Sequence, residues 1–259
     1  FPEQIDSISF EHVSFRYPGA AADELEHISF KVEKGQTLAI IGATGSGKTT
    51  LASLIPRFYD ATAGTVLVDG LDVREYTFDA LYNKLGYVTQ KAVLFAGTVE
   101  DNVFFGQSAA EKTDASLQAA LSLSQAAEFV DKYPEKAAHP IAQLGRNVSG
   151  GQKQRLSIAR ALARTPEILI FDDSFSALDY KTDAVLREGL AKELPGTTKI
   201  IVAQRISTIR NADQILVLDR GEIAGLGTHD ALMASCTVYR EIAMSQLSEE
   251  ELKKGGASK

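Results

Sequence analysis

The chain of 259 residues is poor in several residue types, and each shortage excludes a class of protein. It has a single cysteine, Cys236, and this count excludes an internal disulfide and a cysteine-rich zinc site. Its 27 lysines and arginines are outnumbered by 34 aspartates and glutamates, so we expect no basic face and no nucleic-acid partner. No apolar run reaches the roughly 18–20 residues of a membrane span, and no secretory signal opens the chain. The composition therefore predicts a soluble domain from a reducing compartment.

Hydrophobic residues make up 44% of the chain, which is enough to bury a core. Apolar and polar residues alternate over 8–17, as in a half-buried strand, whereas 38–41 is continuously apolar, as in a central parallel strand. Strand formers become rare over 98–163, which indicates a helical insertion. Further strands are expected at 28–32, 64–68, 85–89, 167–172, 198–203 and 214–219, and helices at 48–58, 152–164, 180–191 and 239–254. This alternation predicts an α/β fold around a parallel sheet.

A glycine-rich loop follows the central apolar strand. Residues 42–49 have the sequence Gly-Ala-Thr-Gly-Ser-Gly-Lys-Thr and lie between a predicted strand and a predicted helix, the context in which this pattern binds phosphate. The glycines let successive backbone N–H groups point inward, and the helix adds its positive N-terminal end. Lys48 can reach the β- and γ-phosphates, and the Thr49 hydroxyl can bind Mg²⁺. Because Asp172 ends a buried strand and supplies a second metal contact, these residues indicate a site for ATP and Mg²⁺.

An aromatic residue, Tyr17, lies beside the turn at Pro18-Gly19. Its ring can stack on adenine, which offers a flat apolar surface and needs few polar contacts. A core tyrosine that flanks a turn is the alternative interpretation.

A second glycine segment, residues 148–152, precedes the predicted helix 152–164. It offers the Ser149 hydroxyl and glycine N–H groups at a helix N-terminus, which is another arrangement that binds anions. One ATP does not need two such cradles from one chain. We therefore expect a head-to-tail dimer, in which this segment covers the γ-phosphate held by the partner's loop.

In this order the motifs resemble those of the nucleotide-binding domain of an ABC transporter, and residues 94–103 resemble exporters more than importers. The resemblance covers residues 8–245. It implies a P-loop NTPase fold, with a RecA-like parallel sheet core, an antiparallel β subdomain and a helical subdomain at about 98–163. It also implies that 1–7 is a linker from a missing transmembrane domain, since the chain does not begin with methionine, and that 246–259 is a C-terminal tail.

The resemblance also assigns roles to single residues. Tyr17 matches the adenine-stacking residue and Gln90 the Q-loop, while 176–179 matches the D-loop. The nucleotide-binding residues that it implies are Tyr17, Gly42, Thr44, Gly45, Ser46, Gly47, Lys48, Thr49, Thr50, Gln90, Ser149, Gly150, Gly151 and Gln152. The Mg²⁺ ligands that it implies are Thr49, Gln90 and Asp172, and the catalytic residues are Asp173, Gln204 and Lys48.

Two positions depart from the family's pattern. Asp173 stands where the family usually has a glutamate that polarises the attacking water, and a catalytic group misplaced by about 1 Å can cost on the order of 10²-fold in rate. Gln204 replaces the switch histidine, and an amide forms hydrogen bonds but carries no charge and relays no proton. Residues 148–152 match the family's signature and keep Ser-Gly-Gly-Gln. The chain therefore resembles one half of a heterodimeric bacterial multidrug-type exporter, the half whose own nucleotide site is degenerate. Gln143, where many homodimeric exporters have a glutamate, fits the same resemblance.

The resemblance implies an ATP-driven motor, in which two chains close on ATP and hydrolysis reopens them to power export across a membrane. The expected partners are a second nucleotide-binding domain, from a different chain with an intact catalytic glutamate and histidine, and transmembrane domains of the same polypeptide. The domain then lies at the cytoplasmic face of the cell membrane. The alternatives are a homodimer with two slow sites, a regulatory nucleotide-binding module and a non-transport ABC ATPase. Membrane helices outside this chain would select the transported substrate.

Overall fold

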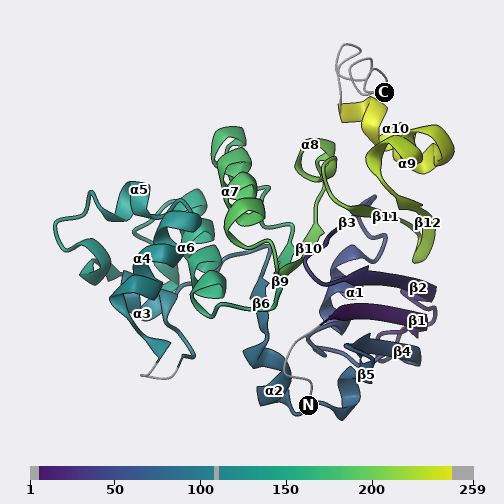
Figure 1. Ribbon diagram of the computed structural model, residues 1–259, viewed down its shortest axis with the longest axis horizontal. Coiled ribbons are helices and arrows are strands. Elements are labelled where there is room, and N and C mark those ends of the chain that lie inside the picture. Colours follow the sequence, from purple (N-terminus) through teal and green to yellow (C-terminus); the bar gives the residue numbers. More distant parts are fainter. Residues whose placement is uncertain (1–5, 108–110, 247–259) are drawn as a thin grey trace. The chain divides into compact units, whose positions relative to one another are not determined.

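The computed structural model describes residues 6–107 and 111–246. The chain forms two compact units, Phe1–Tyr82 together with Thr198–Lys259, and Asn83–Thr197 (Figure 1). Each unit contributes its own strands and its own helices. Within the described ranges, none of the helices combines the length and the apolar character that crossing a bilayer requires.

The first unit contains an antiparallel sheet with the strand order β2-β1-β4-β5. These strands are β1 (Ser7–Phe15), β2 (Leu25–Glu33), β4 (Ala63–Val68) and β5 (Leu71–Asp72). The alternation predicted over 8–17 is present in β1, where Ile8, Phe10 and Val13 are buried. Phe10 lies opposite Phe30 of β2, and their stacked rings have centroids 4.6 Å apart. Cross-strand aromatic pairs of this kind stabilise a sheet and help to fix its register.

Four more strands of the first unit run in the order β12-β11-β3-β10. They are β3 (Thr37–Gly42), β10 (Thr198–Val202), β11 (Gln214–Asp219) and β12 (Glu222–Gly227). β3 pairs in parallel with β10 and with β11, and residues 38–41 are buried, as predicted for a central strand. β12 pairs antiparallel with β11 and has no strand signal in the sequence, because two of its six residues are glycines and none is fully buried.

The helices of the first unit differ from the prediction at their ends. They are α1 (Lys48–Leu54), α2 (Phe78–Asn83), α8 (Ile206–Ile209), α9 (His229–Ser235) and α10 (Thr237–Gln246), with a short 3₁₀ helix η1 (Val73–Glu75). The helix predicted over 48–58 ends at Leu54, because Pro56 lacks an N–H donor and Arg57 turns left-handed with a φ of 59°. α10 begins before the predicted 239–254, whose end lies outside the described residues. α9 contacts both β12 and α10 (Figure 1).

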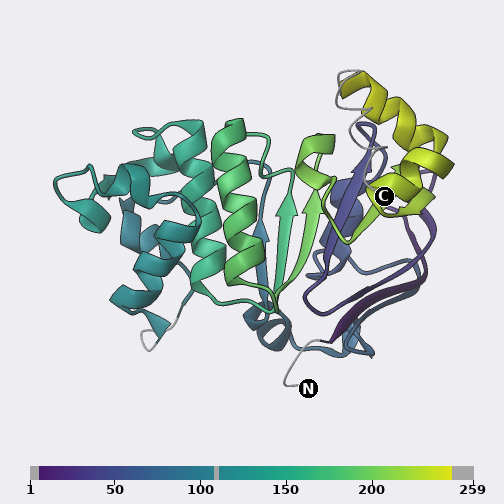
Figure 2. The same cartoon turned by 45° about the horizontal axis from the view of Figure 1, so that its top comes forward.

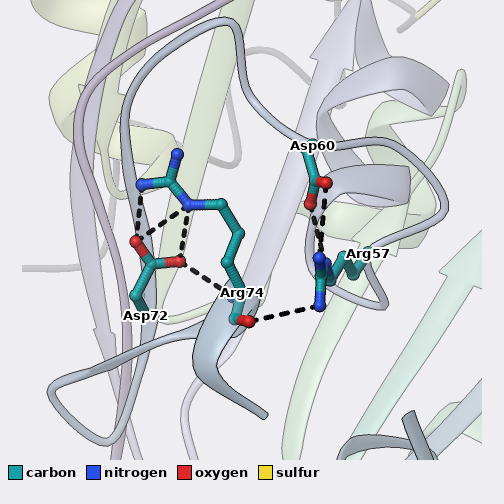
Figure 3. Close-up of polar contacts among 4 residues, drawn as sticks. All are labelled: Arg57, Asp60, Asp72 and Arg74. Carbon is teal, nitrogen blue, oxygen red and sulfur yellow. Dashed lines mark hydrogen bonds and ion pairs between the residues drawn. The ribbon is translucent and has the colours of Figure 1, made fainter. Parts of the chain in front are cut away.

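A polar cluster fixes the turn that follows α1 (Figure 3). Arg57 Nε donates to Asp60 Oδ1 at 2.8 Å, and Arg57 Nη1 donates to the carbonyl of Arg74 at 3.3 Å. The Arg74 guanidinium donates to Asp72 Oδ2 at 2.6 Å, which fixes the backbone around Arg74 as well. Because Tyr59 lies between Arg57 and Asp60, the cluster fixes the backbone on both sides of this aromatic ring.

The second unit contains the parallel strands β6 (Leu85–Val88) and β9 (Ile168–Asp172). Its helices are α3 (Val99–Val103), α4 (Asp114–Leu123), α5 (Ala127–Val130), α6 (Gly150–Ala163) and α7 (Tyr180–Glu193), with the 3₁₀ turns η3 (Lys136–Ala138) and η4 (Gln143–Gly145). α6 contacts α3, α4 and β6 (Figure 2), so it joins the helical part of this unit to its strands.

The segment predicted as a helical insertion also holds a short antiparallel ribbon. β7 (Gly97–Thr98) pairs with β8 (Pro140–Ile141), a pairing that the prediction of a helical insertion over 98–163 did not include. Strands of two residues are too short to show a period of two, so the alternation of side chains does not reveal them. α6 begins at Gly150 rather than at 152, because Ser149 caps it.

Candidate functional site

The glycine-rich loop lies in the first unit, between β3 and α1. Gly42 admits no side chain, because a Cβ atom there would collide with the Leu218 carbonyl oxygen and with the Ser46 hydroxyl. Gly45 and Gly47 have left-handed φ values of 77° and 98°, which glycine adopts without strain. The loop is therefore tightly curved, and it leads the chain into the N-terminus of α1.

The loop presents hydrogen-bond donors. Lys48 Nζ donates to the Gly42 carbonyl at 2.9 Å and to the Ala43 carbonyl at 2.8 Å. The Ser46 side chain is buried, and among the described residues its Oγ has no hydrogen-bond partner. A shallow pocket of about 130 Å³ is lined by Glu24, Gly45, Gly47, Lys48, Thr49 and Thr50. A buried unpaired hydroxyl, an ammonium group and the N–H groups at a helix start fit the oxygens of a phosphate chain.

Tyr17 is attached to the same helix. Its hydroxyl forms a hydrogen bond of 2.7 Å with Thr50 Oγ1, in the first turn of α1. Its half-buried ring meets Phe15 and Tyr59 edge-on, with centroid distances of 4.8 Å and 5.3 Å. These contacts hold the ring at a fixed distance from the glycine-rich loop, and part of its surface stays accessible, as stacking on a base requires.

Two residues beside the loop were not predicted from the sequence. Glu24 lines the pocket together with Lys48, and Tyr59 packs against Tyr17. Neither belongs to a motif or to a periodic pattern. Glu24 precedes β2 and Tyr59 follows α1, and each reaches the site through the way its segment folds against Tyr17 or the loop.

Gln204 lies at the sheet edge that carries the glycine-rich loop. β10 pairs in parallel with β3 so that Val202 is opposite Ile40. Gln204 and Gly42 are each two residues further along their strands, and the hydrogen bond from Ala203 N–H to the Ile40 carbonyl continues the pairing at 3.1 Å. The first unit therefore brings Gln204 to the carboxyl ends of the strands, beside the loop.

The second unit brings Gln90 and Asp173 together. β6 and β9 are paired so that Val88 is opposite Phe171, and Gln90 and Asp173 are each two residues further along. Gln90 Nε2 donates to Asp173 Oδ2 at 3.1 Å. The sequence predicts a role for each residue but does not predict this contact.

The two consecutive carboxylates are buried and held by different neighbours. Asp172 and Asp173 are 5% and 7% exposed. The Tyr87 hydroxyl donates to Asp172 Oδ2 at 3.4 Å, and burial together with the Asp172 charge raises the pKa of Tyr87, so its proton stays available for this bond. Asp173 has a left-handed φ of 48°, and its carbonyl accepts from Ser176 Oγ at 2.8 Å. The backbone at Asp173 is therefore strained and held by a nearby side chain.

The second glycine segment caps α6. Ser149 Oγ accepts the Gln152 N–H at 3.2 Å, and Gln152 Oε1 accepts the Ser149 N–H at 2.8 Å, which forms a capping box. Gly150 is exposed, and a Cβ atom there would meet nothing within 4 Å. The N-terminus of α6 is thus ordered by its own side chains and open on the side of Gly150.

α6 is also tied to the segment that carries Gln90. Gln154 is 1% exposed, and its Nε2 donates to the Thr89 carbonyl at 3.2 Å. Ser174, which follows Asp173, donates through Oγ to the Val88 carbonyl at 2.9 Å. No motif in the sequence points to Gln154 or Ser174, although both fix the backbone beside Gln90.

The two units divide the predicted residues between them. The first unit holds Tyr17, Gly42, Thr44, Gly45, Ser46, Gly47, Lys48, Thr49, Thr50 and Gln204. The second unit holds Gln90, Ser149, Gly150, Gly151, Gln152, Asp172 and Asp173.

The chain is similar to many known proteins. A sequence profile described as ABC transporter matches residues 25–176. An uncharacterized ABC transporter ATP-binding protein of Mycobacterium tuberculosis is 48% identical over 234 residues, which cover 90% of this chain and 40% of that protein. A putative multidrug export ATP-binding/permease protein of Bacillus subtilis is 40% identical over 238 residues, or 91% of this chain and 40% of that protein. An ATP-dependent lipid A-core flippase of Aromatoleum aromaticum is 41% identical over 243 residues, which cover 94% of this chain and 40% of that protein.

A solved structure of a bacterial Atm1-family ABC exporter with ATP bound has a TM-score of 0.91 and 36% sequence identity to this chain. The match covers 96% of this chain and 43% of that one, and the chain spans 40% of the length of each relative described above. The parallel sheet, the antiparallel subdomain and the glycine-rich loop are those of the ABC ATPase P-loop fold. The chain therefore belongs to the ABC transporter family, as a nucleotide-binding domain.

Proposed function

We propose that the chain is the ATP-binding motor domain of an ABC exporter and that hydrolysis at its own nucleotide site is slow. The observation that carries the ATP-binding part is the loop after β3, where Gly42 admits no side chain and the buried Ser46 hydroxyl has no partner among the described residues. The transport part is supported by the export and flippase names of the relatives.

The residues of the loop bind and orient ATP in this proposal. The N–H groups of 42–49 and the Ser46 hydroxyl donate to phosphate oxygens, and Lys48 moves from the Gly42 and Ala43 carbonyls to the β- and γ-phosphates. Thr49, Gln90 and Asp172 would hold Mg²⁺, which neutralises charge on the phosphates. That residues of both units serve one nucleotide rests on the order of the motifs in the family.

Slow hydrolysis follows from two side chains. Asp173 would orient the attacking water with a carboxylate one methylene shorter than glutamate, and Gln90 already engages its Oδ2. A misplacement of about 1 Å is worth on the order of 10²-fold in rate. Gln204 would contact the γ-phosphate through an amide, which forms hydrogen bonds but adds no positive charge.

The signature segment would serve a partner's site. Ser149 Oγ accepts from Gln152 within the capping box and keeps its own O–H for a phosphate oxygen. A head-to-tail dimer uses this segment and the loop 42–49 at the same time. Because the signature is intact while Asp173 and Gln204 are altered, we favour a partner chain that has the catalytic glutamate and histidine over a second copy of this chain.

The remainder of the protein would supply the membrane path. The relatives are longer than this chain, and the Bacillus subtilis relative is named as both ATP-binding protein and permease. We therefore place transmembrane domains in the same polypeptide and this domain at the cytoplasmic face of the cell membrane. Those membrane segments would select the exported substrate.

Calorimetric titration with Mg²⁺ and ATP, followed by phosphate release, tests the proposal. We expect ATP to bind and Lys48→Ala to weaken binding at least ~10-fold, since hydrogen bonds to charged groups are worth about 1.5–3 kcal/mol. Lys31→Ala, which removes the same charge from an exposed position, is the matched control and should bind as the wild type does. Absence of ATP binding would overturn the proposal, and rapid turnover by this chain without a partner would overturn its slow-site part.

A further inference from the structure

The last residue of α10 contacts the loop that carries Gln204. Gln246 Nε2 donates to the Gln204 carbonyl at 2.6 Å, and Gln246 Oε1 accepts the Ile206 N–H at 2.8 Å. One side-chain amide thus binds the backbone on both sides of Arg205. Residue 246 was expected to begin a C-terminal tail, and no motif in the sequence points to a role for it.

This double contact fixes the peptide groups after β10. α8 begins at Ile206, and its N-cap residue, Arg205, makes no side-chain cap hydrogen bond. The first N–H groups of a helix need partners from outside the helix, and Gln246 supplies one to Ile206. At the same time it sets the orientation of the Gln204 carbonyl, which directly follows the Cα atom that carries the Gln204 side chain.

α10 is itself firmly placed. Tyr239 and Ala243 are fully buried, and Gln246 follows them by seven and three residues, so all three share one face of the helix. The Tyr239 hydroxyl forms a hydrogen bond of 2.8 Å with His229 Nδ1, which ties the start of α10 to α9. A packed helix face therefore ends in the amide that holds the backbone at Gln204.

We propose that Gln246 is a positioning residue for hydrolysis: it holds Gln204 at the sheet edge beside the phosphate loop, and α10 sets the turnover rate through this contact. This inference rests on the proposed function and deepens it. Gln246 does not touch the loop 42–49 or Tyr17 in any described contact, so its loss should lower the turnover number and leave ATP affinity unchanged.

The test compares three variants of the full chain. Gln246→Ala removes both hydrogen bonds, whereas Gln246→Glu keeps the length but loses the donor and sets a carboxylate against the Gln204 carbonyl. Ser245→Ala is the matched control, because Ser245 Oγ donates to Ile242 within its own helix. We expect the Ile206 amide to exchange with deuterium at least ~10-fold faster in Gln246→Ala, with the Leu51 amide of α1 unchanged, whereas Gln246→Glu still accepts the Ile206 N–H and should keep its protection.

Turnover and binding complete the test. We expect a fall in turnover number of about 3–10-fold for the Gln246 variants, with the dissociation constant for ATP within about 2-fold of the wild type. Unchanged Ile206 exchange in Gln246→Ala would overturn the clamp, and unchanged turnover with faster exchange in that variant would overturn the role of Gln246 in hydrolysis. Absence of ATP binding would overturn the proposed function, whereas ATP binding without hydrolysis would overturn only the hydrolytic role of Gln246. In either case amide exchange would decide the clamp alone.

Discussion

Gln90 and Asp173 are joined by a hydrogen bond of 3.1 Å, from the amide Nε2 to the carboxylate Oδ2. The contact follows from the register of β6 and β9, which places Val88 opposite Phe171 and carries both residues to the same edge. Gln90 contacts the Asp173 carboxylate directly, so a change at Gln90 should affect Asp173.

Replacing Gln90 with glutamate exchanges a hydrogen bond for contact between two carboxylates. We expect Gln90→Glu to destabilise the fold by about 1–3 kcal/mol at pH 7.5 and by less at pH 5, where protonation of either carboxyl group relieves the repulsion. Gln90→Ala loses the bond without adding charge, so its destabilisation should be similar at both pH values. Thermal unfolding of the three proteins measures this, and equal behaviour of the two variants at both pH values would contradict the contact.

Tyr17 should contribute to ATP affinity through its ring rather than its hydroxyl. Tyr17→Phe loses only the hydrogen bond to Thr50 and should bind ATP within about 3-fold of the wild type. Tyr17→Ala loses the stacking surface, which is worth about 1–3 kcal/mol per base, and should bind about 5–100-fold more weakly. Titration with ATP measures both. Normal ATP affinity in a Tyr17→Ala protein of lowered melting temperature would instead support the core-tyrosine interpretation.

Glu24 lines the pocket beside the glycine-rich loop, so its negative charge lies near the place where we expect the phosphates. Removing this charge with Glu24→Gln should tighten ATP binding by about 2–5-fold at low salt, and by less at high salt, because ions screen the repulsion. Glu26→Gln is the control and should change little, because Glu26 is an exposed residue of β2, two positions after Glu24. Calorimetry at two salt concentrations distinguishes them, and equal affinity in both variants would show that Glu24 does not act on the phosphates.

His229 should make the stability of the chain depend on pH. Burial and the charge of Arg210 lower the pKa of His229 below its ordinary 6.5, against the opposing charge of Asp230. Below pH 6.5 the unfolded state therefore binds more protons at this residue than the folded state does. The free energy of unfolding is highest above pH 6.5 and decreases as pH falls through the lowered pKa of His229.

Urea unfolding at pH 7.5, 6.5 and 5.5 measures that dependence. We expect His229→Gln, which does not titrate, to lose less stability between pH 6.5 and 5.5 than the wild type. Tyr239→Phe keeps the imidazole but removes its partner hydroxyl, so it should be about 1 kcal/mol less stable at pH 7.5 and still depend on pH. The same slope in His229→Gln as in the wild type would assign the pH dependence to other groups.

Features encoded by neighbouring residues could be predicted from the sequence. The apolar run 38–41, the glycines that follow it and Lys48 form a strand, a loop and a helix start in one short segment, and the structure has them there. The capping box at Ser149 is likewise local, although it moved the start of α6 ahead of the predicted position.

Features that depend on distant segments were not predicted. Gln90 and Asp173 are 83 residues apart, and their contact depends on a strand register that no local pattern specifies. Glu24 and Tyr59 reach the site through the antiparallel strands and the turn after α1, and Gln246 reaches Gln204 across 42 residues. Such contacts follow from packing and pairing, which periodicity does not report.

The most direct test of the central claim is ATP turnover at high protein concentration, for the wild-type chain beside the double variant Asp173→Glu/Gln204→His. If the two residues slow this site, the double variant should turn over at least ~10-fold faster with unchanged ATP affinity, because the longer carboxylate restores the reach of the catalytic group. Similar, appreciable turnover in both proteins would show that Asp173 is an adequate base and would contradict the account of a slow site.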